Sequence, residues 1–227
     1  MPDHLDAIFF DVGNTLLFPN REIIYAPLHQ RNLFPTSQQL SALECRTKNE
    51  FDALLEHGRA DHSFWYMFYT RFVDELGVND ASLRDELVRA TQVSANWACM
   101  RPGTREALER LRKIYRIGVI SNADGKIREL LRANGIEDCF LSITDSGTIG
   151  CEKPAPFIFE TALRDMHADA RRSLYLGDMY SVDYLGATRA GMQAVLFDVC
   201  GAYKKKGVPR VESLEEFEQL LAASERS

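Results

Sequence analysis

Five polar side chains in this sequence have the types and the placement that phosphoryl-transfer chemistry needs. They are three carboxylates, one hydroxyl and one ammonium: Asp11, Asp178, Asp183, Ser121 and Lys153. Carboxylate oxygens bind hard cations such as Mg²⁺, and lysine and hydroxyl groups suit the anionic oxygens of a phosphoryl group. A carboxylate can also attack phosphorus to form an aspartyl-phosphate, which splits one hard reaction step into two.

Short apolar runs place three of these side chains at strand ends. Residues 7–10, 117–120 and 173–176 read as buried strands, and Asp11, Ser121 and Asp178 lie at or just beyond their ends. A fourth run covers residues 194–197, and a weaker one covers residues 140–144. Since ligands bind at the carboxyl ends of the strands in an open parallel sheet, we expect Asp11, Ser121 and Asp178 to cluster at one edge.

Helical patterns alternate with these strands. They cover residues 104–114, 126–134, 156–166 and 181–190, and an amphipathic terminal helix covers residues 214–223. Pro156 suits the first turn of its helix, and Gly135 and Gly191 suit helix ends. This alternation predicts an α/β fold, a Rossmann-like doubly wound parallel sheet with helices on both faces.

One long stretch interrupts the alternation. Residues 20–98 look helical throughout, with apolar residues at helical spacing over residues 40–55, 62–76 and 82–98. The aromatic run at residues 64–69 is best interpreted as the packing core of this unit. The sequence therefore predicts an all-helical cap domain, residues 20–98, inserted into a core domain of residues 1–19 and 99–227.

Composition excludes several function classes. A chain of 227 residues fits one large domain, or one domain with a small accessory domain, and a net charge of -6 argues against nucleic acid as a partner. No apolar run approaches the roughly 20 residues that span a bilayer, and no signal peptide is apparent. Five scattered cysteines without a CxxC pair favour reduced thiols in a cytoplasmic protein over a zinc site or disulfides. Whether the chain is a monomer or a homodimer stays open.

Taken in order, the motifs resemble those of the haloacid dehalogenase superfamily over nearly the whole chain. The first family motif, hhhDxDGT, corresponds to residues 8–15, IFFDVGNT. The second, a Ser or Thr at a strand end, corresponds to Ser121, and the third, a lysine often followed by proline, corresponds to Lys153. The fourth, GDxxxxD, is matched in full by residues 177–183, GDMYSVD. The helical insertion is similar to the family's first type of cap, which lies between the first two motifs.

The resemblance implies a magnesium site and a nucleophile. By this analogy, Asp11 is the nucleophile and a Mg²⁺ ligand, and the backbone carbonyl of Gly13 is a second ligand. Asp178 supplies the other protein carboxylate, and Asp183 acts behind it or through water.

The resemblance also implies where a small phosphorylated substrate binds. Ser121, Asn122 and Thr15 would hold its phosphoryl oxygens. Lys153 would bridge Asp11 and the substrate anion and take part in catalysis. The family's fold implies that the first strand is central in the sheet.

Position 13 departs from the family's phosphatases, which carry a second aspartate there as general acid and then base. Gly13 has no side chain, and general acid–base catalysis is typically worth about 10²–10⁴-fold. One interpretation is a phosphatase for substrates with good leaving groups, or one that borrows an acid from the cap or the substrate. Arg21, Tyr25 and His29 are candidates for that acid. The alternatives are a 2-haloacid dehalogenase, whose branch also lacks this aspartate, and a binding protein that has lost turnover.

Overall fold

The computed structural model describes residues 5–58, 63–78 and 80–224. Its centre is a six-stranded parallel sheet in the order β5-β4-β1-β6-β7-β8. The strands are β1 (Ala7–Phe10), β4 (Arg116–Ser121), β5 (Ser142–Asp145), β6 (Ser173–Gly177), β7 (Gln193–Phe197) and β8 (Arg210–Val211). The α/β fold class and the inner position of the first strand are confirmed. The sequence prediction missed β8, because two residues are too few to form a pattern.

Helices cover both faces of the sheet. They are α6 (Thr104–Leu111), α7 (Ile127–Ala133), α8 (Ser146–Ile149), α9 (Pro156–Asp165), α10 (Leu185–Arg189) and α11 (Leu214–Ser224), with 3₁₀ turns at Glu137–Cys139 and Ala170–Arg172. Side chains alternate along β1, so Ile8 and Phe10 pack in one cluster with residues of α6, α7 and α11. Phe9 faces the other way, into a cluster with residues of α9 and α10. The helices α6, α7, α9, α10 and α11 each begin or end within a few residues of a predicted bound, whereas α8 was not predicted.

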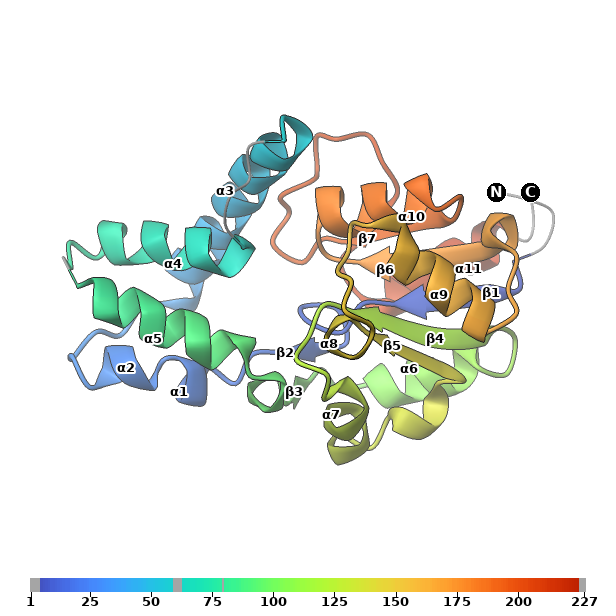
Figure 1. The fold of residues 1–227 in the computed structure, drawn as a ribbon, viewed down its shortest axis with the longest axis horizontal. Helices are drawn as coiled ribbons and strands as arrows, with labels where there is room; N and C mark the ends of the chain where they lie inside the picture. The colour runs from blue at the N-terminus through green and yellow to red at the C-terminus, as the bar shows by residue number, and fades with distance from the viewer. Residues whose placement is uncertain (1–4, 59–62, 79, 225–227) are drawn as a thin grey trace.

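The long insertion forms a separate helical unit beside the sheet (Figure 1). We use that name for α1 (Arg21–Ile24), α2 (Ala26–His29), α3 (Ser37–Glu56), α4 (Phe64–Glu75) and α5 (Ala81–Gln92). Phe64, Phe68 and Tyr69, all from the aromatic run, are buried in a cluster that this unit largely forms by itself, which supports the prediction of a packing core.

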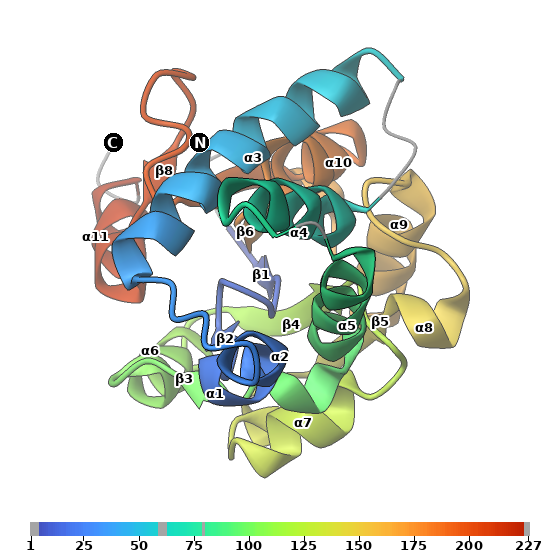
Figure 2. The ribbon, with the colours of Figure 1, turned by 90° about the vertical axis from the view of Figure 1, so that its left-hand side faces the viewer.

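A two-stranded antiparallel ribbon lies where the chain enters and leaves the helical unit. It pairs β2 (Leu17–Phe18) with β3 (Cys99–Met100), and neither strand was predicted. In Figure 1 the arrows of β1 and β4 point toward the helical unit, and Figure 2 shows that unit in front of the end of β1. The helical unit therefore covers the carboxyl edge of the sheet. The proposed domain boundaries at residues 19/20 and 98/99 fall at this ribbon and remain a prediction.

Two predicted helices differ in detail. The helix predicted over residues 82–98 ends at Gln92, and a 3₁₀ turn follows at Ser94–Asn96. Side chains of Asn96 and Trp97 donate hydrogen bonds to the carbonyls of Ala90 and Thr91, so the helix end is capped by the residues that were expected to extend it. The helix predicted from residue 181 begins as a π-helical turn, Tyr180–Tyr184.

Some sequence predictions fall outside the described residues. These are the N-terminal residues 1–4, which bear on the expectation of no signal peptide, and the start of a helix at His62; within the described part, that helix begins after Ser63. Among the described residues no helix has the length and apolar character to cross a membrane. All five cysteines are free.

Candidate active site

Asp11 lies directly after the central strand, at the bottom of the space beneath the helical unit. Its backbone N–H donates to the carbonyl of Leu176, which extends the pairing of β1 with β6 by one residue. The chain then turns sharply, because the Val12 carbonyl accepts from the N–H groups of Leu16 and Leu17. Asn14 takes a left-handed conformation in this turn (φ 55°), which asparagine tolerates better than most residues. The turn fixes the Asp11 carboxyl group at the strand end.

Lys153 uses all three of its donors inside the site. Its Nζ lies 2.7 Å from Asp11 Oδ1, 2.8 Å from Asp183 Oδ1 and 2.8 Å from the Tyr175 hydroxyl. Burial disfavours the charged ammonium, but the two carboxylates outweigh this effect and raise the pKa of Lys153 above its usual range. The predicted contact between Lys153 and Asp11 is therefore present.

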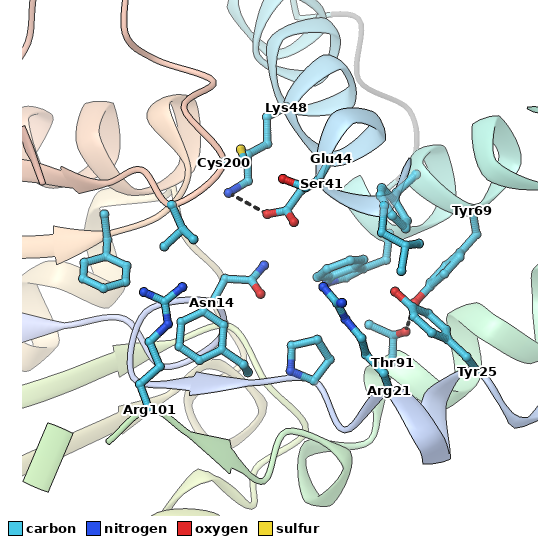
Figure 3. Close-up of a pocket in the computed structure, with 17 residues that line it drawn as sticks. Asn14, Arg21, Tyr25, Ser41, Glu44, Lys48, Tyr69, Thr91, Arg101 and Cys200 are labelled. Carbon is cyan, nitrogen blue, oxygen red and sulfur yellow. Dashed lines mark hydrogen bonds and ion pairs between the residues drawn. The ribbon is translucent and has the colours of Figure 1, made fainter. Parts of the chain in front are cut away.

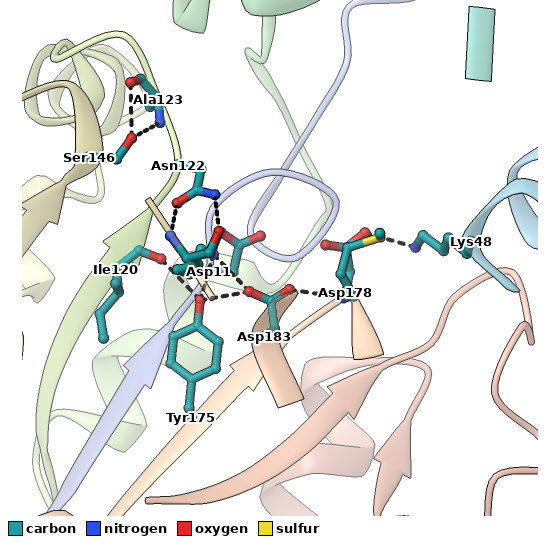
Figure 4. A network of polar contacts seen from close by, with 11 residues as sticks. Asp11, Lys48, Ile120, Asn122, Ala123, Ser146, Tyr175, Asp178 and Asp183 are labelled. Carbon is teal, nitrogen blue, oxygen red and sulfur yellow. Dashed lines mark hydrogen bonds and ion pairs between the residues drawn. The ribbon is translucent and has the colours of Figure 1, made fainter. Parts of the chain in front are cut away.

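Three buried carboxylates meet beside this lysine. Asp11, Asp178 and Asp183 each offer an oxygen within 4.8 Å of the others, the only such metal-ligand cluster in residues 5–58, 63–78 and 80–224 (Figure 4). Burial raises the pKa of Asp11, Lys153 lowers it and the other two carboxylates raise it, which together bring the pKa to about 7. Burial raises the pKa of Asp178 as well. Excess negative charge held away from water favours a bound cation.

The loop after β6 explains the spacing of the fourth motif. A Cβ at Gly177 would lie 2.5 Å from the carboxyl carbon of Asp183, so no side chain fits there. Asp183 Oδ2 accepts from the backbone N–H of Met179, and its Oδ1 accepts from Lys153. With both oxygens engaged in this way, Asp183 holds the loop that carries Asp178, consistent with a role behind the metal ligands.

The three residues predicted to bind the phosphoryl group, Ser121, Asn122 and Thr15, have different surroundings. Ser121 is buried at the carboxyl end of β4, next to β1. The Asn122 side chain accepts from Lys153 N (2.7 Å) and donates to Lys153 O (3.0 Å), so it positions the lysine. Thr15 lines a second cavity beside Arg101 and α11, and its buried hydroxyl has no hydrogen-bond partner in the described residues. Substrate contact by Ser121, Asn122 and Thr15 remains a prediction.

Sequence reasoning missed two buried charged residues on α3. Lys48 Nζ lies 2.8 Å from Asp178 Oδ2, and its side chain is 2% exposed. One turn later, Asp52 accepts hydrogen bonds from the backbone N–H and the hydroxyl of Ser181. The only signal in the sequence is their spacing of four residues on one helix face, which normally indicates a solvated stripe.

A pocket of about 210 Å³ lies between the helical unit and the strand ends (Figure 3). Its lining includes Asn14 from the first-motif turn, Glu44 and Lys48 from α3, and the aromatic rings of Trp65 and Phe68. Of the residues suggested as a borrowed acid, Arg21 and Tyr25 line this pocket. His29 does not line it; its ring stacks on Phe34.

Comparison with known proteins gives the same family. The profile of the family described as haloacid dehalogenase-like hydrolase matches residues 5–191. A glyceraldehyde 3-phosphate phosphatase from Methanothermobacter thermautotrophicus is 40% identical over 197 residues, covering 85% of each chain. The haloacid dehalogenase-like hydrolase domain-containing protein 3 of Xenopus laevis is 28% identical over 96% of this chain and 94% of its own.

Solved structures agree on the fold. The HAD-hydrolase YfnB from Bacillus subtilis, solved bound to magnesium, aligns with a TM-score of 0.70 and 18% identity, covering 96% of this chain and 99% of its own. At that identity the likeness concerns the fold alone. Since the family profile spans most of the sequence and the fold agrees, the chain belongs to the haloacid dehalogenase-like hydrolases.

Proposed function

We propose that this hydrolase is a Mg²⁺-dependent phosphatase for a small phosphorylated metabolite, acting through an aspartyl-phosphate on Asp11. The observation that carries the proposal is the placement of Asp11, with Lys153 at 2.7 Å and two further carboxylates beside it at a strand edge. A relative that is 40% identical over 85% of each chain is a glyceraldehyde 3-phosphate phosphatase, which supports phosphate esters as the substrate class.

The donor set fits magnesium. Mg²⁺ prefers oxygen ligands, and the cluster offers the carboxylates of Asp11 and Asp178. The Gly13 carbonyl accepts no hydrogen bond from the described part of the chain, so it is available as a third ligand. When bound, the ion would supply positive charge that offsets repulsion between the nucleophile and the phosphoryl anion.

The protein's own groups would then carry the reaction. Asp11 attacks phosphorus and expels the alcohol, and water later attacks the same phosphorus and restores Asp11. Lys153 holds the Asp11 carboxylate in place and offsets its charge. By analogy with the family, we assign Ser121, Asn122 and Thr15 to binding the phosphoryl oxygens.

The pocket limits the size of the substrate. A volume of about 210 Å³ suits a small metabolite, and the mixed lining of aromatic rings and charged side chains suits a polar one. The carboxylate cluster favours a phosphatase over a 2-haloacid dehalogenase, since dehalogenation needs no metal and gains nothing from three adjacent acids.

A panel of substrates tests this proposal. Phosphate esters, glyceraldehyde 3-phosphate among them, and 2-haloacids are each assayed with Mg²⁺ and with a chelator. We expect phosphate release that depends on Mg²⁺. Halide release independent of metal would contradict the proposal in favour of a dehalogenase, and no turnover across a broad panel would favour a binding protein.

A further inference from the structure

The side chain that lies closest to position 13 is not an acid. A Cβ built on Gly13 would meet the ring of Trp97 at 3.4 Å, so this aromatic side chain lies over the position where an acid is missing. Trp97 donates its indole N–H to the Thr91 carbonyl and therefore offers no proton to the site. A general acid that the protein itself supplies must therefore come from another element.

Only one carboxylate is among the described residues that line the pocket. It belongs to Glu44, which extends from α3 into the pocket in Figure 3. Its side chain is 26% exposed, in contrast to the nearly buried Lys48 one turn along the helix. Glu44 can therefore reach a bound small molecule, whereas most other acids of α3 face solvent or other parts of the protein.

Lys48 connects Glu44 to the reaction centre. Its Nζ lies 3.1 Å from Glu44 Oε1 and 2.8 Å from Asp178 Oδ2. The Glu44 carboxyl group is thus separated from the proposed metal ligand Asp178 by a single ammonium. Glu44 therefore lies in a pocket that adjoins the carboxylate cluster through Lys48, and the leaving group of the phosphate ester would occupy this pocket.

The helix that carries Glu44 is fixed to the sheet domain. Asp52 binds Ser181, and the Asn49 side chain donates to the Ala202 carbonyl at 3.2 Å. Residues 44, 48 and 52 are spaced by four, so they share one face of α3. Glu44 is therefore presented to the site by a docked helix, a more precise support for catalysis than a loop.

We propose that Glu44 is the general acid–base of this enzyme and takes over the role of the carboxylate missing at position 13. This inference rests on the proposed phosphatase function. As Asp11 forms its bond to phosphorus and the bond from phosphorus to the ester oxygen breaks, Glu44 in its acid form gives its proton to that oxygen. The resulting carboxylate then takes a proton from the water that attacks the aspartyl-phosphate, which releases phosphate and restores both side chains.

The test compares leaving groups in Glu44→Gln. With Mg²⁺, kcat/KM for glyceraldehyde 3-phosphate, an alkyl ester, should fall by about 100-fold or more, because alkoxides need protonation to leave. The value for p-nitrophenyl phosphate should fall much less, since that leaving group is stable without a proton. Glu50→Gln is the matched control: Glu50 lies on the same helix but pairs with Arg71 on the surface, so both rates should stay unchanged.

A second variant distinguishes an acid–base role of Glu44 from a purely structural role as the ion-pair partner of Lys48. Gly13→Asp, added to Glu44→Gln, should restore most of the alkyl-ester rate, since it returns a carboxylate to the site without restoring the partner of Lys48. Equal loss on both esters without this rescue would overturn the inference and leave the phosphatase function intact. Wild-type protein that releases no phosphate from either ester would overturn both.

Discussion

At the scale of single residues, Lys153 stabilises the buried carboxylate cluster. Three acids in close contact are tolerated in a buried site because this ammonium binds two of them directly and Lys48 binds the third. The same contact holds the Asp11 carboxylate at a defined orientation. Lys153 therefore serves stability and catalysis together, and its removal should affect both.

Lys153→Met should lower kcat by at least about 100-fold and the free energy of unfolding by about 3–5 kcal/mol, because it leaves buried carboxylates without their partner. Added Mg²⁺ should recover part of the stability, since it replaces the lost positive charge. Phosphatase assays and chemical denaturation measure the two effects. Lys113→Met, on the exposed surface, is the control. Wild-type kcat in Lys153→Met would contradict the role given to this lysine.

The sequence was sufficient to predict the residues that follow strands. Asp11 and Asp178 are placed by strand ends, and strand ends can be recognised in a single sequence. Lys48 and Glu44 could not be predicted in the same way, because their contacts with the site depend on how α3 docks against the sheet domain. A charged residue on a helix has the same local signature whether it faces water or a distant carboxylate.

At the scale of elements, the contact between Asp52 of α3 and Ser181 in the segment after β6 connects the helical unit to the catalytic centre. We call this contact the dock. Asp52 accepts two hydrogen bonds from Ser181. On the same helix, four residues before Asp52, Lys48 forms its ion pair with Asp178. Burial raises the pKa of Asp52, which agrees with its removal from solvent. A defect in this contact should loosen α3 without affecting the sheet.

Asp52→Ala should weaken the dock by about 1–3 kcal/mol, because it leaves a buried N–H and a hydroxyl of Ser181 without their acceptor. We expect a higher KM, with faster hydrogen exchange in α3 and unchanged exchange in β1 and β4. Exchange measured by mass spectrometry on Asp52→Ala and on the surface variant Glu50→Ala would check this. Unchanged exchange in α3 would show that the contact does not hold the helix.

Elements with a long regular pattern were predicted well, and short ones were not. The strands β1, β4, β6 and β7 carry clear apolar patterns, as does α9, which begins at Pro156 as expected. The ribbon of β2 and β3 has two residues per strand, and its pairing joins positions more than 80 residues apart, so no local pattern reveals it. The π-helical turn at Tyr180–Tyr184 likewise depends on contacts outside its own segment.

At the scale of the whole molecule, the helical unit covers a site in which buried carboxylates repel one another, and a bound cation would relieve this repulsion. Burial raises the pKa of Asp11 to about 7, so in the metal-free protein the contribution of this group to stability is lost as pH rises from about 4 toward 7. Mg²⁺ binds the ionised carboxylates and should compensate for this loss.

The rise in Tm on adding Mg²⁺ should therefore be small at pH 5.5 and larger at pH 8, because at the lower pH the ion must displace a proton from Asp11. Thermal denaturation at both pH values, with Mg²⁺ or chelator, gives the comparison. Asp178→Asn should lose most of the shift at either pH. A shift of equal size at pH 5.5 and pH 8 would contradict the assignment of these carboxylates as the metal site.

The central claim is that Asp11 becomes phosphorylated during turnover. Rapid acid quench of the enzyme with glyceraldehyde 3-phosphate and Mg²⁺, followed by borohydride reduction, converts an aspartyl-phosphate to homoserine, which peptide mass spectrometry locates. We predict homoserine at position 11 only when substrate and Mg²⁺ are both present, and none in Asp11→Asn. Homoserine at another position, or phosphate release at the wild-type rate by Asp11→Asn, would contradict the account.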